Sequence, residues 1–280
     1  MSVISNLFRR TNQDVASRGY AAAMNSVLSR TNSQLVVKGL TPSLKKTLSH
    51  NRVLLISNHP NQAEVLAILA ALPQRSDYYL VANHKFFSIL PAIDHHLIPV
   101  YIDHQSTEKH VSWKLRLFKK LHYHADLDKT IAHQKNIDSI ALASQKLSAG
   151  ALVQIFPVIK DATKEFSPGV GYLLKNSQSI SKTQVVMIHV AGTSDLDYLR
   201  LLPFVGKFLP PFEITFSHAY SASDFIAETG QATANNLEIT YRAWFSSVNH
   251  LLTKPTLGFR AVNRSYLLFR TLLLWLFTTH

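Results

Sequence analysis

A short apolar run that leads directly into a helical pattern constrains this chain more than any other feature of its sequence. Val53–Ile56 is continuously apolar, which is typical of a strand buried on both faces. Polar residues end the run, Pro60 suits the first turn of a helix, and apolar residues then recur at helical spacing as far as Leu72. The pattern predicts a strand, a turn and a helix, with His59 at the carboxyl end of the strand, where sites in open α/β sheets usually lie.

The same alternation of apolar runs and helical patterns continues along the chain. Further strands are expected at residues 34–37 (an edge strand), 77–82, 97–102, 151–156, 184–190 and 212–216. Helices are expected at residues 41–48, 137–147, 168–174 and 229–249, with another opening at 83–87 and a connecting segment at 219–226. Alternating strands and helices with short links predict an α/β fold. We expect one domain over residues 34–250, built on a mixed, mostly parallel sheet flanked by helices.

His59 and Glu64 form a candidate catalytic pair. They are five positions apart, so a regular helix would not stack them, but Glu64 can reach back if His59 lies just before the first helical turn. The carboxylate would then accept a hydrogen bond from one imidazole nitrogen and fix the tautomer, while the other nitrogen takes a proton from a hydroxyl nucleophile. The alternative is a surface histidine beside an acidic residue that the helix dipole favours.

The sequence Asn58-His59, followed by four residues and Glu64, resembles the first block of the glycerolipid acyltransferases of the lysophosphatidate acyltransferase type. That block is Asn-His, four residues and Asp, so the acid here is one methylene longer. Further blocks follow in the family's order over about residues 35–245: residues 79–84, 98–103, 152–157, 166–172 and 185–190. The order of the blocks carries the resemblance more than any single block.

The resemblance implies a fold and a reaction. The expected reaction moves a fatty acyl group from a coenzyme A or acyl-carrier-protein thioester to the hydroxyl of a lysophospholipid or related lipid, with His59 as general base and Glu64 as its partner. No bound cofactor is expected, because the thioester is a co-substrate. The residues expected to bind substrate are Asn58, Asn61, Lys85, Phe86, Phe87, His104, Phe156, Pro157, Lys160, Lys164 and Gly169.

Several of these assignments have a plainer alternative. Phe86 and Phe87 would line a slot for an acyl chain, although apolar runs of this kind usually belong to the core. Lys160 and Lys164 would face a phosphate as point charges, or they decorate a loop. Gly169 would permit close approach at a helix start, which also tolerates glycine without a ligand.

The chain also departs from the family pattern. Val158–Asp161 replaces the family's Glu-Gly-Thr-Arg, His104 stands where its second block ends in Arg, and His189 replaces the Pro of its last strand. In the family, those Glu and Arg residues hold a phosphate-bearing acceptor. Because both positions differ here, the sequence leaves the identity of the acceptor open. A second hypothesis is therefore a catalytically altered lipid-binding protein on the same scaffold, which predicts an apolar channel beside a poorly assembled His59–Glu64 pair.

The charge balance indicates an anionic partner. There are 29 Lys and Arg against 17 Asp and Glu, a net charge of +12. An anionic lipid surface or the phosphates of the acyl donor would be such a partner. Binding to nucleic acid is suggested by the net charge alone and is not expected, because the sequence contains no recognisable nucleic-acid-binding module.

The chain has no cysteine, which excludes disulfides and a thiolate nucleophile. Its histidines lack metal-ligand spacing with acidic partners, so no metal site is expected.

Both ends of the chain suggest contact with a membrane surface. Residues 1–33 read as a basic amphipathic pair of helices or one bent helix, and residues 251–280 as a basic, increasingly apolar tail. Packing against the domain's own core is the alternative for each. No convincing signal peptide or membrane-spanning run is found, so we expect a peripheral or monotopic protein on the cytoplasmic face of a membrane.

Overall fold

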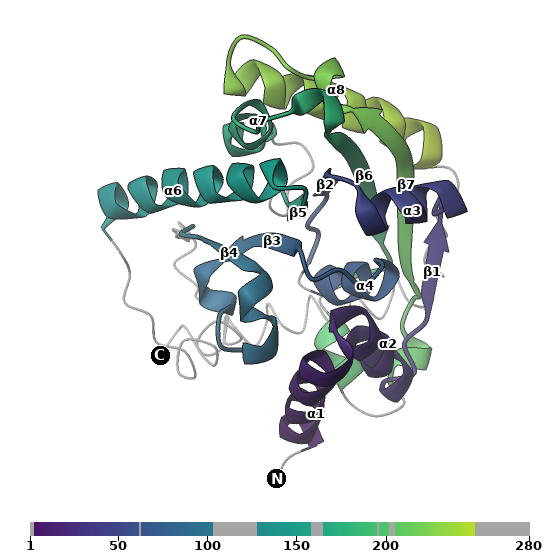
Figure 1. Ribbon diagram of the computed structural model, residues 1–280. Helices are drawn as coiled ribbons and strands as arrows, with labels where there is room; N and C mark the ends of the chain where they lie inside the picture. Colours follow the sequence, from purple (N-terminus) through teal and green to yellow (C-terminus); the bar gives the residue numbers. More distant parts are fainter. Residues whose placement is uncertain are drawn as a thin grey trace, which may run out of the picture.

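A single mixed sheet with helices on both faces organises the protein (Figure 1). The computed structural model describes residues 3–61, 63–102, 128–157, 165–194, 196–201 and 205–249. Within these residues the sheet has seven strands in the order β1-β7-β6-β2-β5-β3-β4. All neighbouring strands are parallel except β6 and β7, which are antiparallel. The predicted α/β class with a mostly parallel sheet is confirmed.

The strand bounds agree closely with the apolar runs of the sequence. They are Leu35–Lys38 (β1), Val53–Ser57 (β2), Tyr78–Asn83 (β3), Leu97–Val100 (β4), Leu152–Ile155 (β5), Gln184–Ala191 (β6) and Phe212–Ser221 (β7). The predicted edge strand is β1, at one end of the strand order.

The central strand β2 is buried along its whole length because both faces of the sheet are covered. Val53 and Leu55 face a core formed with α2 (Tyr20–Arg30), α3 (Pro42–His50) and α4 (Glu64–Ala71). Leu54 and Ile56 face the opposite core, formed with α6 (Lys129–Ser148), α7 (Pro168–Lys175) and α8 (Gly230–Val248). Successive side chains of a strand point to opposite faces, so this strand needs an uninterrupted apolar sequence.

The N-terminal segment forms two helices, α1 (Val3–Arg18) and α2, separated by Gly19 with a φ of 82°. The second packs against α4: Tyr20 is fully buried and its hydroxyl donates to the carbonyl of Pro73 at 2.8 Å. Of the two predicted forms, a pair of helices or one bent helix, the structure has the pair, and α2 packs on the domain's own core. None of the helices in the described ranges is long and apolar enough to cross a membrane. The predicted C-terminal tail, residues 251–280, lies outside the described residues.

Four predicted boundaries were wrong. Helix α6 begins at Lys129, eight residues before the predicted start at residue 137, and the Asp128 side chain caps it. The helix after β2 begins at Glu64 and not at Pro60, because the side chains of Asn58 and Asn61 hold the preceding loop to β6 and to Thr193 just after it. The helix expected at 83–87 is a single 3₁₀ turn, η1 (His84–Phe86), which ends before Ser88 with its positive φ of 67°. Strand β7 runs on to Ser221 through the expected connecting segment, because its far end pairs with the start of β6.

Candidate active site

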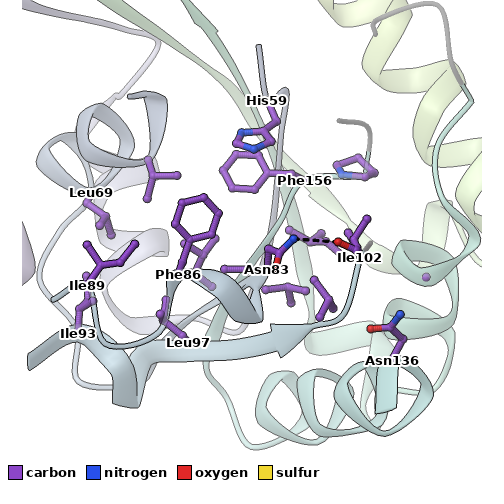
Figure 2. A pocket seen from close by; sticks show the side chains of 18 of the residues that line it. His59, Leu69, Asn83, Phe86, Ile89, Ile93, Leu97, Ile102, Asn136 and Phe156 are labelled. Carbon is purple, nitrogen blue, oxygen red and sulfur yellow. Dashed lines mark hydrogen bonds between the residues drawn. The ribbon is translucent and has the colours of Figure 1, made fainter. Parts of the chain in front are cut away.

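The candidate site lies at the carboxyl edge of the parallel strands. His59 follows β2, Phe156 follows β5, and Asn83 ends β3. Because parallel strands bring their carboxyl ends to one edge of the sheet, residues far apart in sequence meet there. Figure 2 shows the imidazole of His59 above the ring of Phe156, with Asn83 nearby.

His59 and Glu64 are in direct contact through Nδ1 of the imidazole and Oε1 of the carboxylate. The Glu64 side chain is 0% exposed and that of His59 is 16% exposed. Among the described residues, neither carboxylate oxygen has a hydrogen-bond partner elsewhere. Glu64 is the first residue of α4, where the positive end of the helix dipole favours a negative charge.

The start of α4 at Glu64 is what lets a spacing of five residues bring the pair together. Pro60, Asn61 and Ala63 lie outside the helix, and Glu64, at its start, meets the preceding histidine. The imidazole also stacks on Phe156, with ring centroids 4.6 Å apart and an angle of 29° between the planes. One ring nitrogen therefore faces the carboxylate, and the other remains available to a substrate.

A large apolar cavity of about 1010 Å³ adjoins His59. One side is formed by α1, α2 and α4, through Leu7, Met24 and Leu69 among others, and the other by α6 and α7, through Ile140 and Tyr172. Figure 2 shows Leu69, Ile89 and Ile93 together on the side away from His59. Such a cavity suits a hydrocarbon chain better than a polar metabolite, because burial of apolar surface is its main source of affinity.

Two amides in the cavity lining are engaged with the main chain. Asn83 Nδ2 donates to the carbonyl of Ile102 at 3.1 Å. Asn136 accepts from the backbone N–H of Tyr101 at 2.6 Å and donates to its carbonyl at 3.1 Å. These bonds fix residues 101 and 102 after β4, so this part of the cavity wall has a defined position.

The predicted substrate-binding residues fall into three groups. Phe86, Phe156, Pro157 and Gly169 line the cavity. Asn58, Asn61, Lys85 and Phe87 are not among the described residues that line it. His104, Lys160 and Lys164 lie outside the described residues.

Asn58 and Asn61 instead bond to the neighbouring strand β6 and its extension. Asn58 bonds both backbone groups of Val190, and Asn61 donates to the hydroxyl of Thr193 at 3.1 Å. Both asparagines flank His59 in sequence, so these bonds attach the loop that carries it to β6.

Sequence reasoning missed a buried ion pair after β6. Asp197 accepts from Arg200 Nε at 2.7 Å and from the backbone N–H of Ser194 at 2.7 Å, and both charged side chains are 6% exposed. Burial raises the pKa of Asp197, the Arg200 charge opposes that shift, and the nearby charge of Glu64 adds to it. The spacing of three residues on one turn was the available signal.

The contribution of the N-terminal helices to the cavity was also missed. Leu7, Phe8 and Thr11 of α1 line it together with Met24 and Val27 of α2. Their amphipathic pattern was visible in the sequence, but not the cavity that the apolar face would meet. Over the described residues, no group of three His, Cys, Asp or Glu side chains is placed to hold a metal ion.

Comparison with known proteins gives a likeness in structure but not in sequence. No protein-family model matches the sequence, and no curated protein sequence matches it. Among solved structures the chain is similar to the 1-acyl-sn-glycerophosphate (LPA) acyltransferase PlsC from Thermotoga maritima, at 11% sequence identity and a TM-score of 0.48. The likeness covers 90% of this chain and 97% of that chain.

Proposed function

We propose that this protein is an acyltransferase that moves a fatty acyl group from a thioester donor to the hydroxyl of a lipid acceptor. The observation that carries the proposal is the contact between the buried Glu64 and His59, which lines a large apolar cavity. A histidine oriented by a carboxylate is suited to take a proton from a hydroxyl. The apolar cavity beside it is suited to hold the hydrocarbon chain of a substrate.

In the proposed reaction the acceptor hydroxyl gives its proton to the free nitrogen of His59 as its oxygen attacks the thioester carbonyl carbon. The tetrahedral intermediate then collapses, the carbon–sulfur bond breaks, and the imidazolium returns the proton to the departing thiolate. The products are an ester and a free thiol, so no oxidant or reductant is needed. Glu64 stabilises the imidazolium between the two proton transfers.

The chemistry of the substrates follows from the site and from the blocks of sequence described above. We propose coenzyme A or acyl-carrier protein as the donor carrier and a lysophospholipid or related lipid as the acceptor. The net charge of +12 favours phosphate-bearing substrates. His104, Lys160 and Lys164 stay predictions for phosphate contacts.

The test is transfer of a labelled acyl group from acyl-coenzyme A or acyl-carrier protein to lysophospholipids by the parent and by His59→Ala. We expect product from the parent and a loss of about 10²- to 10⁴-fold in turnover for the variant. His50→Ala is the matched control, because His50 is an exposed histidine on α3 that bonds its own helix. Equal product from the parent and His59→Ala would refute the assignment.

A catalytically altered lipid-binding protein is the second candidate, motivated by the replaced block at Val158–Asp161. It predicts a poorly assembled pair, whereas His59 and Glu64 are in contact, which supports the enzyme. Glu64→Asp restores the acid of the family block. Turnover by the parent or by Glu64→Asp favours the enzyme. Saturable binding of a labelled fatty acid by both proteins, without turnover on any acceptor, favours the binding protein.

We further propose that the side of the molecule formed by α1 and η5 (Val205–Phe208) docks on an anionic membrane surface. Phe208 is 74% exposed and Lys207 lies beside it, with Nζ 4.8 Å from its ring centroid. The backbone N–H of Gly206 donates to the carbonyl of Thr31 at the end of α2, which places η5 next to the N-terminal helices. Phe8 and Arg9 of α1 are also exposed. Exposed aromatic and basic residues are suited to a lipid interface.

Vesicle binding by Phe208→Glu tests this docking. We expect binding to vesicles that contain phosphatidylglycerol to weaken about tenfold, the equivalent of about 1.4 kcal/mol. Ile239→Glu is the control, because Ile239 is 67% exposed on α8, on the other side of the molecule (Figure 1). Binding of the parent to these vesicles should decrease with salt concentration and should exceed its binding to duplex DNA. Equal loss of vesicle binding in Phe208→Glu and Ile239→Glu would contradict the proposed surface.

A further inference from the structure

The backbone of β2 leaves the sheet two residues before His59, and a side chain takes its place. The parallel ladder between β2 and β6 ends at the pair Ser57 and Ile188, although β6 continues to Ala191. The side chain of Asn58 then donates from Nδ2 to the carbonyl of Val190 at 2.9 Å and accepts from its N–H at 2.7 Å. The amide thus replaces the backbone groups that a further strand residue would supply.

Asparagine suits this position for a specific chemical reason. Its short side chain carries a donor and an acceptor side by side, which matches the N–H and carbonyl of one strand residue. Aspartate has the same shape but no donor, so one carboxylate oxygen would face the carbonyl oxygen of Val190. Alanine would leave both backbone groups of Val190 without this partner, and buried backbone groups without partners are costly.

Tyr241, far from Asn58 in the sequence, holds the backbone of Asn58. The hydroxyl of Tyr241, on α8, donates to the carbonyl of Ile188 at 3.2 Å, and the backbone N–H of Asn58 lies close enough to the same oxygen to oppose the rise in the pKa of Tyr241. Burial raises the pKa of Tyr241 well above its ordinary value, so the hydroxyl keeps its proton. The Nδ1 atom of His189 lies 3.3 Å from the same oxygen, and the His189 ring stacks on Phe245.

The other side of the loop is attached as well. Asn61 donates from Nδ2 to the hydroxyl of Thr193 at 3.1 Å. His59 therefore lies between two attachments to the β6 segment, and its imidazole meets Glu64 on one side and the cavity on the other. Because these bonds attach the loop before and after His59, the direction of the imidazole depends on them.

We propose that Asn58 and Tyr241 are positioning residues for His59: they fix the main chain at Asn58 so that the imidazole meets Glu64 and faces the cavity. Neither residue lines the cavity within the described ranges, so neither is expected to bind substrate. The kinetic part of the inference rests on the proposed acyl transfer, whereas the structural part does not.

The kinetic experiment compares Asn58→Asp, Asn58→Ala and Tyr241→Phe with the parent. We expect kcat to fall up to about a hundredfold with KM for donor and acceptor unchanged, because a small displacement of a reacting group costs rate rather than affinity. The control is Asn51→Asp, since Asn51 is an exposed asparagine that bonds Gln184 at the opposite end of β6. A raised KM with unchanged kcat would make Asn58 a substrate ligand and overturn the proposal.

The second readout needs no substrate. In protein with isotope-labelled histidine, the magnetic resonance signal of His59 is assigned by its absence in His59→Gln. We expect this signal to lose its hydrogen-bond shift in Asn58→Asp and in Tyr241→Phe. The shift should remain in Asn51→Asp. A variant that melts earlier but keeps both the parent kcat and the parent His59 signal would show a merely structural role and overturn the proposal. Tyr241→Phe removes a single oxygen and retains the buried ring, so it keeps the test available if Asn58→Ala fails to fold. A parent without turnover would refute acyl transfer, while the His59 signal would still decide the positioning role.

Discussion

Nδ1 of His59 and Oε1 of Glu64 are in contact although the two residues belong to different elements, the exit of β2 and the first turn of α4. The carboxylate is fully buried, and within the described residues it has no hydrogen-bond partner apart from the imidazole. A buried carboxylate in contact with an imidazole is suited to stabilise the protonated ring.

Replacing the carboxylate by a neutral group of the same shape should separate charge from packing. For Glu64→Gln we expect kcat to fall by about 10²- to 10⁴-fold with the fold retained, because an amide cannot stabilise the imidazolium. Steady-state transfer rates and a thermal melt are the measurements. Glu213→Gln is the matched control, since Glu213 is also buried but pairs with Lys38 between β7 and β1. An unchanged kcat in Glu64→Gln would contradict the role proposed for the pair.

Narrowing the cavity away from His59 should change the preferred length of the acyl chain. Ile89 lines the cavity on that side (Figure 2). We expect Ile89→Trp to shift the ratio of medium-chain to long-chain transfer by about tenfold or more in favour of medium chains. The reason is that each methylene that loses its burial costs about 0.8 kcal/mol. Competing acyl-coenzyme A donors measure the ratio. Ile239→Trp on the exposed face of α8 should leave it unchanged; the same shift in both variants would count against the assignment of the cavity.

The partly buried His189 should make stability depend on pH. Burial lowers the pKa of His189 from 6.5 to about 4, so the folded state favours the neutral ring. The stability that comes from this preference is fully present above the unfolded pKa of about 6.5. It is lost as pH falls towards 4, by about 3 kcal/mol in total. Urea unfolding of the parent and His189→Leu at several pH values measures it. The variant should lose less stability than the parent between pH 6.5 and 4, whereas His50→Leu should behave like the parent; equal slopes for His189→Leu and the parent would contradict the prediction.

The close packing of α7 on α8 should make one of two nearby glycines intolerant of a side chain. A Cβ atom at Gly171 would lie 1.8 Å from the carbonyl oxygen of Gly230, whereas the nearest neighbour of one at Gly169 would be the Cδ1 atom of Ile140, at 3.4 Å. We expect Gly171→Ala to lower the free energy of unfolding by about 3 kcal/mol. Gly169→Ala should be neutral or stabilising by up to about 1 kcal/mol, because alanine favours helix. Urea denaturation compares them, and equal stabilities would contradict the close approach.

Local patterns predicted most of the secondary structure and the identity of the candidate pair. The apolar run at Val53–Ile56 predicted the central strand because both faces of that strand are buried. The helix expected at residues 41–48 is α3, which the Thr41 side chain caps. Where local patterns competed with distant contacts, the prediction failed. Pro60 suited a helix start, but bonds from Asn58 and Asn61 to β6 keep that segment in a loop.

The sequence by itself determined the alternation of elements and the neighbourhood of His59 and Glu64, because periodicity and a spacing of five residues are local properties. Only the tertiary structure decided that Asn58 engages Val190, 132 residues away, that α1 and α2 line the cavity, and that Tyr241 reaches the turn before His59. Such contacts depend on strand order and helix packing, which bring together side chains that no local pattern relates.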